Sequence, residues 1–268
     1  MDLSDVTIYI PTKGRAGKQV TLNSLGDDQL GVCTLLVDAD EFDNYCLEVD
    51  DINIISMPPE VKGIGKVRQW AVENCPTPYL FLMDDDMVFF RRIGDTVKLE
   101  KCAPDMMEEL FDELLNWMSL DDIPVVGLSA RQGNNNNPNI YQEATRQMNF
   151  HGIDVQRFKA LGLRFDGQDV MEDFYMTLSL LTQGIPNRVM YQYCWNQKGS
   201  GSEGGCSSYR TWEMQKRCAE ELAATFPDFV TVVEKTTKTT WKDFPTRFDV
   251  RVQWKKAYTH GTKQYDLL

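Results

Sequence analysis

Residues 79–90, YLFLMDDDMVFF, place three adjacent carboxylates inside an otherwise apolar run. The apolar residues that follow Pro78 predict a strand that is buried on both faces. Aspartates in such a setting are costly unless something neutralises them. At the carboxyl end of a central strand they would face the crevice in which open α/β sheets bind ligands. The stretch therefore predicts an α/β fold with a ligand site at the Asp triplet.

The spacing of these aspartates indicates a metal site. Asp84 and Asp86 alternate along an extended strand, so we expect their carboxylates on the same face. Two carboxylates on one face suit a hard divalent cation that also bridges phosphates, Mg²⁺ or Mn²⁺. The alternative is a solvated acidic turn, which the apolar residues on both sides disfavour.

Length and composition are those of a globular protein. A chain of 268 residues, 42% of them hydrophobic, can form one large domain or a domain with an appendage. No apolar run approaches the ~20 residues of a membrane span, and the acidic residues 1–5 are unlike a signal peptide. The chain has seven cysteines, none of them in a Cys-x-x-Cys pair, and only two histidines, which disfavours a zinc site. We expect the cysteines to be reduced thiols in a cytoplasmic protein.

Charge is unevenly distributed along the chain. The net charge of −12 disfavours a generic nucleic-acid binder, because affinity for phosphate comes largely from Lys and Arg. Residues 229–268, however, contain eight Lys or Arg and four acids, a net charge of +4. An acidic body with a basic end is compatible with one face that meets a polyanion, and equally with a solvated basic tail.

The order of the predicted elements is that of an α/β protein with a mostly parallel central sheet flanked by helices. Besides the strand that leads into the Asp triplet, strands are predicted at residues 6–10, 33–37, 52–56, 124–129, 148–153 and 188–193. Helices are predicted at residues 20–25, 63–74, 105–118, 155–160, 174–182 and 213–224. Gly63 and Gly65 lack the spacing of a dinucleotide fingerprint, which disfavours a Rossmann dehydrogenase.

Two further features bear on function. Glu172 and Asp173 precede the helix at 174–182, where the helix dipole alone would favour acids, but where they could also serve acid–base chemistry. The Gly- and Ser-rich residues 195–206 predict a mobile loop that closes on a phosphate or sugar, with a linker as the alternative. His151 lies in an apolar strand, and we expect a semi-buried, hydrogen-bonded histidine there.

This succession of a basic loop, an acidic cluster, an Asp-x-Asp and a later Glu-Asp pair resembles glycosyltransferases of the GT-A fold. The resemblance covers about residues 6–206. Within that fold, the sequence IPTKGRAGK at residues 10–18, followed by Thr21 and Leu22, resembles the phage TET-associated glycosyltransferases. That group is associated with sugar transfer onto 5-hydroxymethylpyrimidine in DNA.

The resemblance implies a role for each candidate residue. Asp84 and Asp86 would hold Mn²⁺ or Mg²⁺ on the diphosphate of a UDP-sugar donor. Asp173 would be the general base and Glu172 an orienting neighbour, with the two roles interchangeable. The residues expected to bind the donor nucleotide or sugar are Pro11, Thr12, Lys13, Arg15, Asp38, Glu41, Lys66, Arg68 and Asp85.

The resemblance also implies a domain plan and a partner. Residues 1–226 would form the catalytic domain, with a nucleotide-sugar half at about 1–100 and an acceptor half at about 101–226. Residues 227–268 would form a basic extension that packs on it. The acceptor would be 5-hydroxymethylcytosine or a related hypermodified base in double-stranded phage DNA, in the host cytoplasm, flipped out of the helix. Trp195, Tyr209 or residues 134–137 would then hold the flipped base or fill the gap.

The sequence departs from the GT-A pattern in two ways. Many enzymes of that fold place a histidine late in the chain as a metal ligand, and here Asn196, His260 or water would have to serve. The overall acidity is also unexpected for an enzyme that modifies DNA. Three alternatives stay open: an acceptor that is a glycan or small molecule, a metal-dependent nucleotidyltransferase, and a DNA-binding module with a degenerate site.

Overall fold

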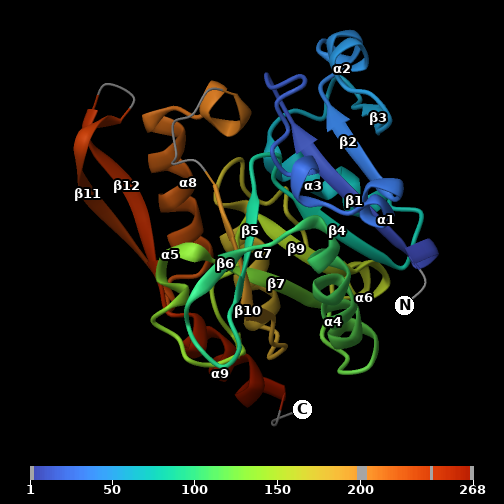
Figure 1. Cartoon of the computed structure of the whole chain (residues 1–268). Helices are drawn as coiled ribbons and strands as arrows, with labels where there is room; N and C mark the ends of the chain where they lie inside the picture. The colour runs from blue at the N-terminus through green and yellow to red at the C-terminus, as the bar shows by residue number, and fades with distance from the viewer. Residues whose placement is uncertain (1–2, 198–203, 242–243, 266–268) are drawn as a thin grey trace.

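A computed structural model describes residues 3–197, 204–241 and 244–265 of the chain (Figure 1). Its helices are α1 (Asp27–Gly31), α2 (Phe42–Glu48), α3 (Ile64–Glu73), α4 (Met107–Ser119), α5 (Arg131–Asn134), α6 (Val155–Ala160), α7 (Glu172–Leu181), α8 (Trp212–Thr225) and α9 (Trp254–Tyr265), with short 3-10 turns at Leu3–Asp5, Leu22–Ser24, Pro104–Met106 and Gly205–Ser208. In these ranges no helix combines the length and the apolar content that crossing a membrane requires.

One ten-stranded sheet forms the centre of the molecule. In spatial order its strands are β3 (Asn53–Ser56), β2 (Cys33–Val37), β1 (Val6–Thr12), β4 (Tyr79–Met83), β9 (Phe150–Asp154), β7 (Val125–Ala130), β10 (Arg188–Asn196), β5 (Val88–Arg92) and β6 (Leu99–Lys101), with β8 (Tyr141–Glu143) paired to β10. The run from β3 to β4 and the pair β7–β10 are parallel, whereas the other pairs are antiparallel. The predicted α/β class, with helices flanking a central sheet, is confirmed.

Strict alternation along the parallel strands explains why helices cover both faces. Ile8 and Ile10 of β1 pack with α4 and Tyr45 of α2 in one hydrophobic cluster, whereas Tyr9 packs with α3, α6 and α7 in another. Successive strand residues point to opposite faces, so an unbroken apolar strand contributes to two cores at once. The parallel half of the sheet is therefore held between two layers of helices (Figure 1).

The C-terminal part of the chain packs against the second face of α7. β11 (Val230–Trp241) and β12 (Phe244–Val252) form an antiparallel hairpin. A third hydrophobic cluster joins Phe174 and Leu178 of α7 to Leu222 of α8, Val230 of β11 and Ala257 of α9. The basic C-terminal residues are thus anchored to the same helix that carries Glu172 and Asp173.

The Asp triplet lies in a turn and not in a strand. β4 ends at Met83, and the chain turns through residues 84–86 before β5 begins. The Thr21 hydroxyl donates to the Asp84 carbonyl (2.6 Å) and accepts from the Met87 amide (2.9 Å). These bonds engage backbone groups that a continuing strand would use in the sheet. The expectation that Asp84 and Asp86 alternate along a strand is therefore wrong.

Several elements were not predicted from the sequence. They include α1, α2, α5, α9, β6 and β8, which are short or rich in polar residues. The helix expected at 20–25 is a single 3-10 turn, followed by α1. Of the Gly- and Ser-rich loop expected at 195–206, residues 198–203 lie outside the described part of the chain.

Candidate active site

A cavity of about 630 Å³ opens beside the Asp triplet, at the carboxyl ends of β1, β2 and β4. Eleven of the thirteen candidate residues line it, namely Pro11, Thr12, Lys13, Arg15, Asp38, Arg68, Asp84, Asp85, Asp86, Glu172 and Asp173. The other two do not. Glu41 accepts a hydrogen bond from the Gly14 amide (2.8 Å), so it supports the loop after β1, and Lys66 is exposed on α3.

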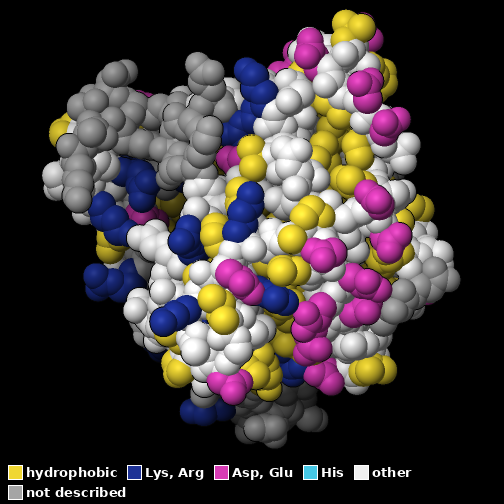
Figure 2. Space-filling view, viewed as in Figure 1, with side chains coloured by type: hydrophobic (Ala, Val, Ile, Leu, Met, Phe, Trp, Pro, Cys, Tyr) yellow, Lys and Arg dark blue, Asp and Glu magenta, His cyan; other side chains and the backbone are white. Residues whose placement is uncertain are grey.

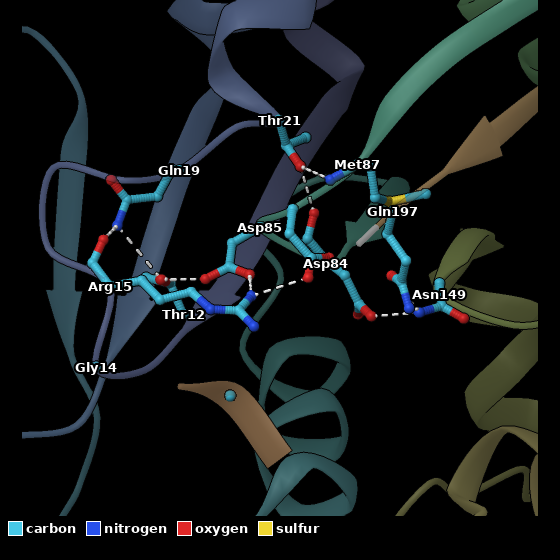
Figure 3. A network of polar contacts seen from close by, with 12 residues as sticks. Thr12, Gly14, Arg15, Gln19, Thr21, Asp84, Asp85, Met87, Asn149 and Gln197 are labelled. Carbon is cyan, nitrogen blue, oxygen red and sulfur yellow. Dashed lines mark hydrogen bonds and ion pairs between the residues drawn. The ribbon is translucent and has the colours of Figure 1, made fainter. Parts of the chain in front are cut away.

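The carboxylates of Asp84 and Asp85 point in opposite directions (Figure 3). Asp85, only 4% exposed, accepts from the Thr12 hydroxyl (2.5 Å) and from the Arg15 guanidinium. Arg15 also binds Asp86 (3.1 Å). Burial raises the pKa of Asp85, and burial together with the charge of Asp84 raises the pKa of Asp86 to about 6. This acidic turn therefore holds more negative charge than its surroundings stabilise.

Arg68 joins the Asp triplet to the acidic pair at the start of α7. Its buried guanidinium donates to Asp84 Oδ1 (2.7 Å) and to Glu172 Oε1 (2.6 Å). The second Asp84 oxygen accepts from Asn149 (2.5 Å), whose amide also donates to Gln197 (3.0 Å). One buried cation thus fixes two carboxylates that are far apart in the sequence, and it does so inside the cavity.

Glu172 and Asp173 form the first turn of α7. The residue before them, Met171, has φ 66°, a left-handed conformation uncommon for a non-glycine residue and typical of functional sites. Burial raises the pKa of both carboxyls, while Arg68 opposes the shift for both and Arg146 opposes it for Asp173. Asp173 is the more exposed of the two, and its Oδ1 accepts from the Phe174 amide (3.0 Å).

The loop after β1 is held from two sides. The Tyr45 hydroxyl of α2 accepts from the Arg15 amide (3.1 Å) and bonds Thr12 (3.0 Å). On the other side, the Gly205 amide donates to the Lys13 carbonyl (2.9 Å). Gly204 has φ +83°, and a Cβ there would lie 2.6 Å from the same carbonyl. The Lys13 ammonium pairs with Asp38 at the end of β2.

Several residues that line the cavity escaped the sequence argument. They are Lys62, Arg146, Asn149, Arg210, Met214, Gln215, Arg247 and Asp249. Asn149 lies opposite the Asp triplet because β9 pairs with β4 in the register Met83 to Phe150. That pairing joins segments more than sixty residues apart, and the local pattern around Asn149 carries no sign of it. Trp195 and Tyr209 do line the cavity, whereas residues 134–137 do not.

The donor set suits a hard cation. Asp84 and Asp86 supply carboxylate oxygens, and a divalent ion would offset the burial and the charge of Asp84 that raise the pKa of Asp86. Within the ranges that the structure describes, no group of three or more His, Cys, Asp or Glu side chains is arranged around a common point for a metal. Asn196 and His260 do not line the cavity, and the His260 ring packs against Phe229 (ring centroids 5.4 Å).

His151 is a core residue. Its ring is fully buried, bonds the Gln147 amide through Nδ1 (3.2 Å), and packs edge-on against Phe165. Burial lowers the pKa of His151 well below its usual range, so the ring is neutral. The expected hydrogen bond is confirmed, whereas the expectation of a semi-buried ring is wrong because the strand lies in the core.

The fold and the cavity define an α/β protein with a ligand-sized site, lined by both acidic and basic side chains, at the carboxyl end of its sheet. Residues 6–205 match the family described as TET-Associated Glycosyltransferase, so the chain belongs to that family. The resemblance to the TET-associated glycosyltransferases is thereby confirmed.

Two curated relatives are similar over part of their length. The Beta-glucosyl-HMC-alpha-glucosyl-transferases of Enterobacteria phages T2 and T6 are each 24% identical over 189 residues, 65% of this chain and 65% of each relative. Among solved structures, Staphylococcus aureus TarS 1-349 in complex with UDP aligns with a TM-score of 0.48 at 13% identity, over 81% of this chain and 65% of TarS 1-349. The complex with UDP-GlcNAc aligns with a TM-score of 0.47 at 12% identity, over 81% and 66%.

Proposed function

We propose that this chain is a metal-dependent glycosyltransferase that moves a sugar from a UDP-sugar to a hydroxyl on 5-hydroxymethylcytosine, or a related base, in double-stranded phage DNA. The observation that carries the proposal is that the Asp triplet and the Glu172–Asp173 pair face one cavity and are joined there by Arg68. A donor site and an acceptor site that share one space are what a direct sugar transfer requires.

The donor would lie beside the Asp triplet. Asp84 and Asp86 are the residues that would hold Mg²⁺ or Mn²⁺, and such an ion neutralises the diphosphate that leaves with the nucleotide. Lys13 lines the same side and adds positive charge near the diphosphate. Asp38, which pairs with Lys13, would accept hydrogen bonds from the base or ribose. Asp85 and Arg15 would fix the shape of this side through their buried pair.

Asp173 is the better candidate for the general base. The Glu172 carboxylate is held by Arg68, whereas Asp173 is more exposed to the cavity and able to meet an acceptor hydroxyl. A base works best when its pKa lies near the working pH, and burial shifts the pKa of Asp173 upward in that direction. In an inverting displacement Asp173 would take the hydroxyl proton while Glu172 and Arg68 keep the start of α7 in place.

The names of the two phage relatives refine the acceptor. They describe transfer to beta-glucosyl-HMC, which supports two candidate acceptor hydroxyls for this chain, one on the hydroxymethyl group and one on a sugar already attached to it. The test is a set of transfer reactions with UDP-glucose and other UDP-sugars, with Mn²⁺ or with a chelator. The acceptors are cytosine DNA, hydroxymethylcytosine DNA, glucosylated hydroxymethylcytosine DNA and a simple glycan.

We expect labelled sugar on one of the two modified DNAs, release of UDP, and loss of both with the chelator. Label on the glycan and none on DNA would contradict the acceptor. Consumption of a nucleoside triphosphate with release of pyrophosphate would instead favour a nucleotidyltransferase.

A further inference from the structure

Part of the cavity wall lies outside the family match, which ends at residue 205. Arg210 and two residues of α8, Met214 and Gln215, line the cavity, as do Arg247 and Asp249 of β12. The segment that follows residue 205 therefore builds one side of the site. Any acceptor that reaches the cavity from that side must pass the β11–β12 hairpin.

The hairpin is held in place along its open edge. Gln215 donates from its side chain to the Phe248 carbonyl (2.9 Å), and the Trp212 indole donates to the Thr246 carbonyl (3.1 Å). Both carbonyls belong to the edge of β12 that does not pair with β11. These bonds satisfy an edge that would otherwise be open, and they give the hairpin a fixed position beside the cavity.

One face of the hairpin is predominantly basic. Arg247, Asp249 and Arg251 alternate along β12, and Lys235 of β11 lies on the same face, since its ammonium binds Asp249 (2.7 Å). Arg247 also contacts Asp249 (3.4 Å), while the Arg247 Nε is buried and has no hydrogen-bond partner among the described residues. Three cations therefore accompany one acid on this face, and one of them lines the cavity.

Positive charge is also concentrated toward the hairpin in the molecule as a whole. Residues 229–268 have a net charge of +4, which leaves −16 for residues 1–228. Figure 2 shows Lys and Arg side chains gathered over the half of the molecule that contains the hairpin, β5 and β6, and Asp and Glu over the half that contains α2 and α4. An extended polyanion would be repelled by the acidic half and attracted to the hairpin half.

We propose that the basic face of the β11–β12 hairpin binds the phosphodiester backbone of the DNA acceptor, with Arg247 at the cavity, Lys235 directly across from it on β11, and Arg251 further along β12. The proposal rests on the proposed function, in that it takes DNA as the acceptor. Contacts to phosphate position a duplex without reading its sequence. The hairpin would thus hold the strand so that the modified base reaches Asp173.

The test is binding of a fluorescent DNA duplex by the full chain, followed by anisotropy over a range of salt concentrations. The hairpin variant is Lys235→Gln with Arg251→Gln. The matched control, Lys159→Gln with Arg164→Gln, removes the same charge from exposed positions on and after α6. The single variant Arg251→Gln, at an exposed position, tests the same surface in case the double variant does not fold. Thermal unfolding is recorded for all variants.

We expect the hairpin variant to bind the duplex roughly tenfold more weakly and to lower the slope of log K against log salt by about 2, because each lost phosphate contact removes ~0.9 from the slope. The control should match the wild type, and Arg251→Gln should lower the slope by about 1. Equal slopes for hairpin variant and control would overturn the docking surface. The wild type's hydrolysis of UDP-sugars without DNA reports separately on the glycosyltransferase proposal.

Discussion

Ion pairs hold both the Asp-triplet turn and the β11–β12 hairpin, yet water reaches the two regions very differently. The side chains of Arg68 and Glu172 are 5% and 8% exposed, whereas Lys235 and Asp249 are 54% and 20% exposed. A buried pair fixes geometry at a high cost if one partner is lost. An exposed pair contributes little to stability and leaves its charge available to a ligand. The first arrangement suits the reacting centre and the second suits a surface that binds a polyanion.

The largest expected effect is that of Arg68→Met, which breaks the buried pairs. Glu172, 8% exposed, would keep a buried charge without its cation, and Asp84, 26% exposed, would also lose its partner, so unfolding in urea should show a loss of ~3–5 kcal/mol. The control is Arg91→Met, which breaks a pair with Glu100 whose side chains are 33% and 39% exposed and should cost less than ~1 kcal/mol. Similar losses for the two variants would remove the distinction between the regions.

A smaller effect is expected from Gly204→Ala. The new Cβ would meet the Lys13 carbonyl, and the positive φ adds strain of ~1–3 kcal/mol. Gly63→Ala is the matched control, because Gly63 also has a positive φ (+92°) but nothing within 4 Å of an added Cβ. Both should lose stability on heating, and only Gly204→Ala should also weaken UDP binding by calorimetry. Equal UDP affinity in the two variants would argue against a role for the 204–205 contact.

The pKa of Asp86 predicts a pH effect at the turn. Because burial and Asp84 raise the pKa of Asp86 to about 6, the folded protein binds a proton there more readily than the unfolded chain does. The contribution of this group to stability should therefore fall as pH rises from about 4 to about 6. Asp86→Asn should flatten that part of the stability profile in metal-free buffer. A variant with the same profile as the wild type would contradict the raised pKa.

The smallest effect is expected at the hairpin. Lys235→Gln removes an exposed partner of Asp249 and should change the free energy of unfolding by less than ~1 kcal/mol. Urea unfolding measures it beside Arg68→Met. A loss as large as that of Arg68→Met would show that the hairpin pair is structural, and would weaken its assignment as a docking surface.

Local pattern was sufficient to predict the parallel half of the sheet. Strands at residues 6–10, 33–37 and 79–83 that are almost entirely apolar indicate burial on two faces, and two helical layers cover them. The place of Glu172 and Asp173 at the start of a helix follows from the apolar residues behind them. The same rules led to the error at the Asp triplet, because the bonds of Thr21 that turn the chain there come from a segment over sixty residues away.

The rest of the site depends on long-range packing. Asn149 joins it through the register of β9 on β4, and Arg247 through the position of a hairpin about a hundred residues later. α9 escaped prediction because its sequence is rich in Lys and Thr and includes Gly261, which fits only through close contact with Gly184. The sequence also did not predict that Arg68 is buried and pairs with Asp84 and Glu172, because basic residues near a phosphate site are expected to face the ligand.

The central claim is that the Asp triplet and the Glu172–Asp173 pair are the donor and acceptor sides of one sugar-transfer site. The most direct test is the rate of transfer from a UDP-sugar to the modified DNA that the wild type accepts, compared with Asp173→Asn. A missing general base should lower that rate by ~10²–10⁴-fold, with UDP binding and thermal unfolding little changed. A variant that transfers sugar at the wild-type rate would contradict the account.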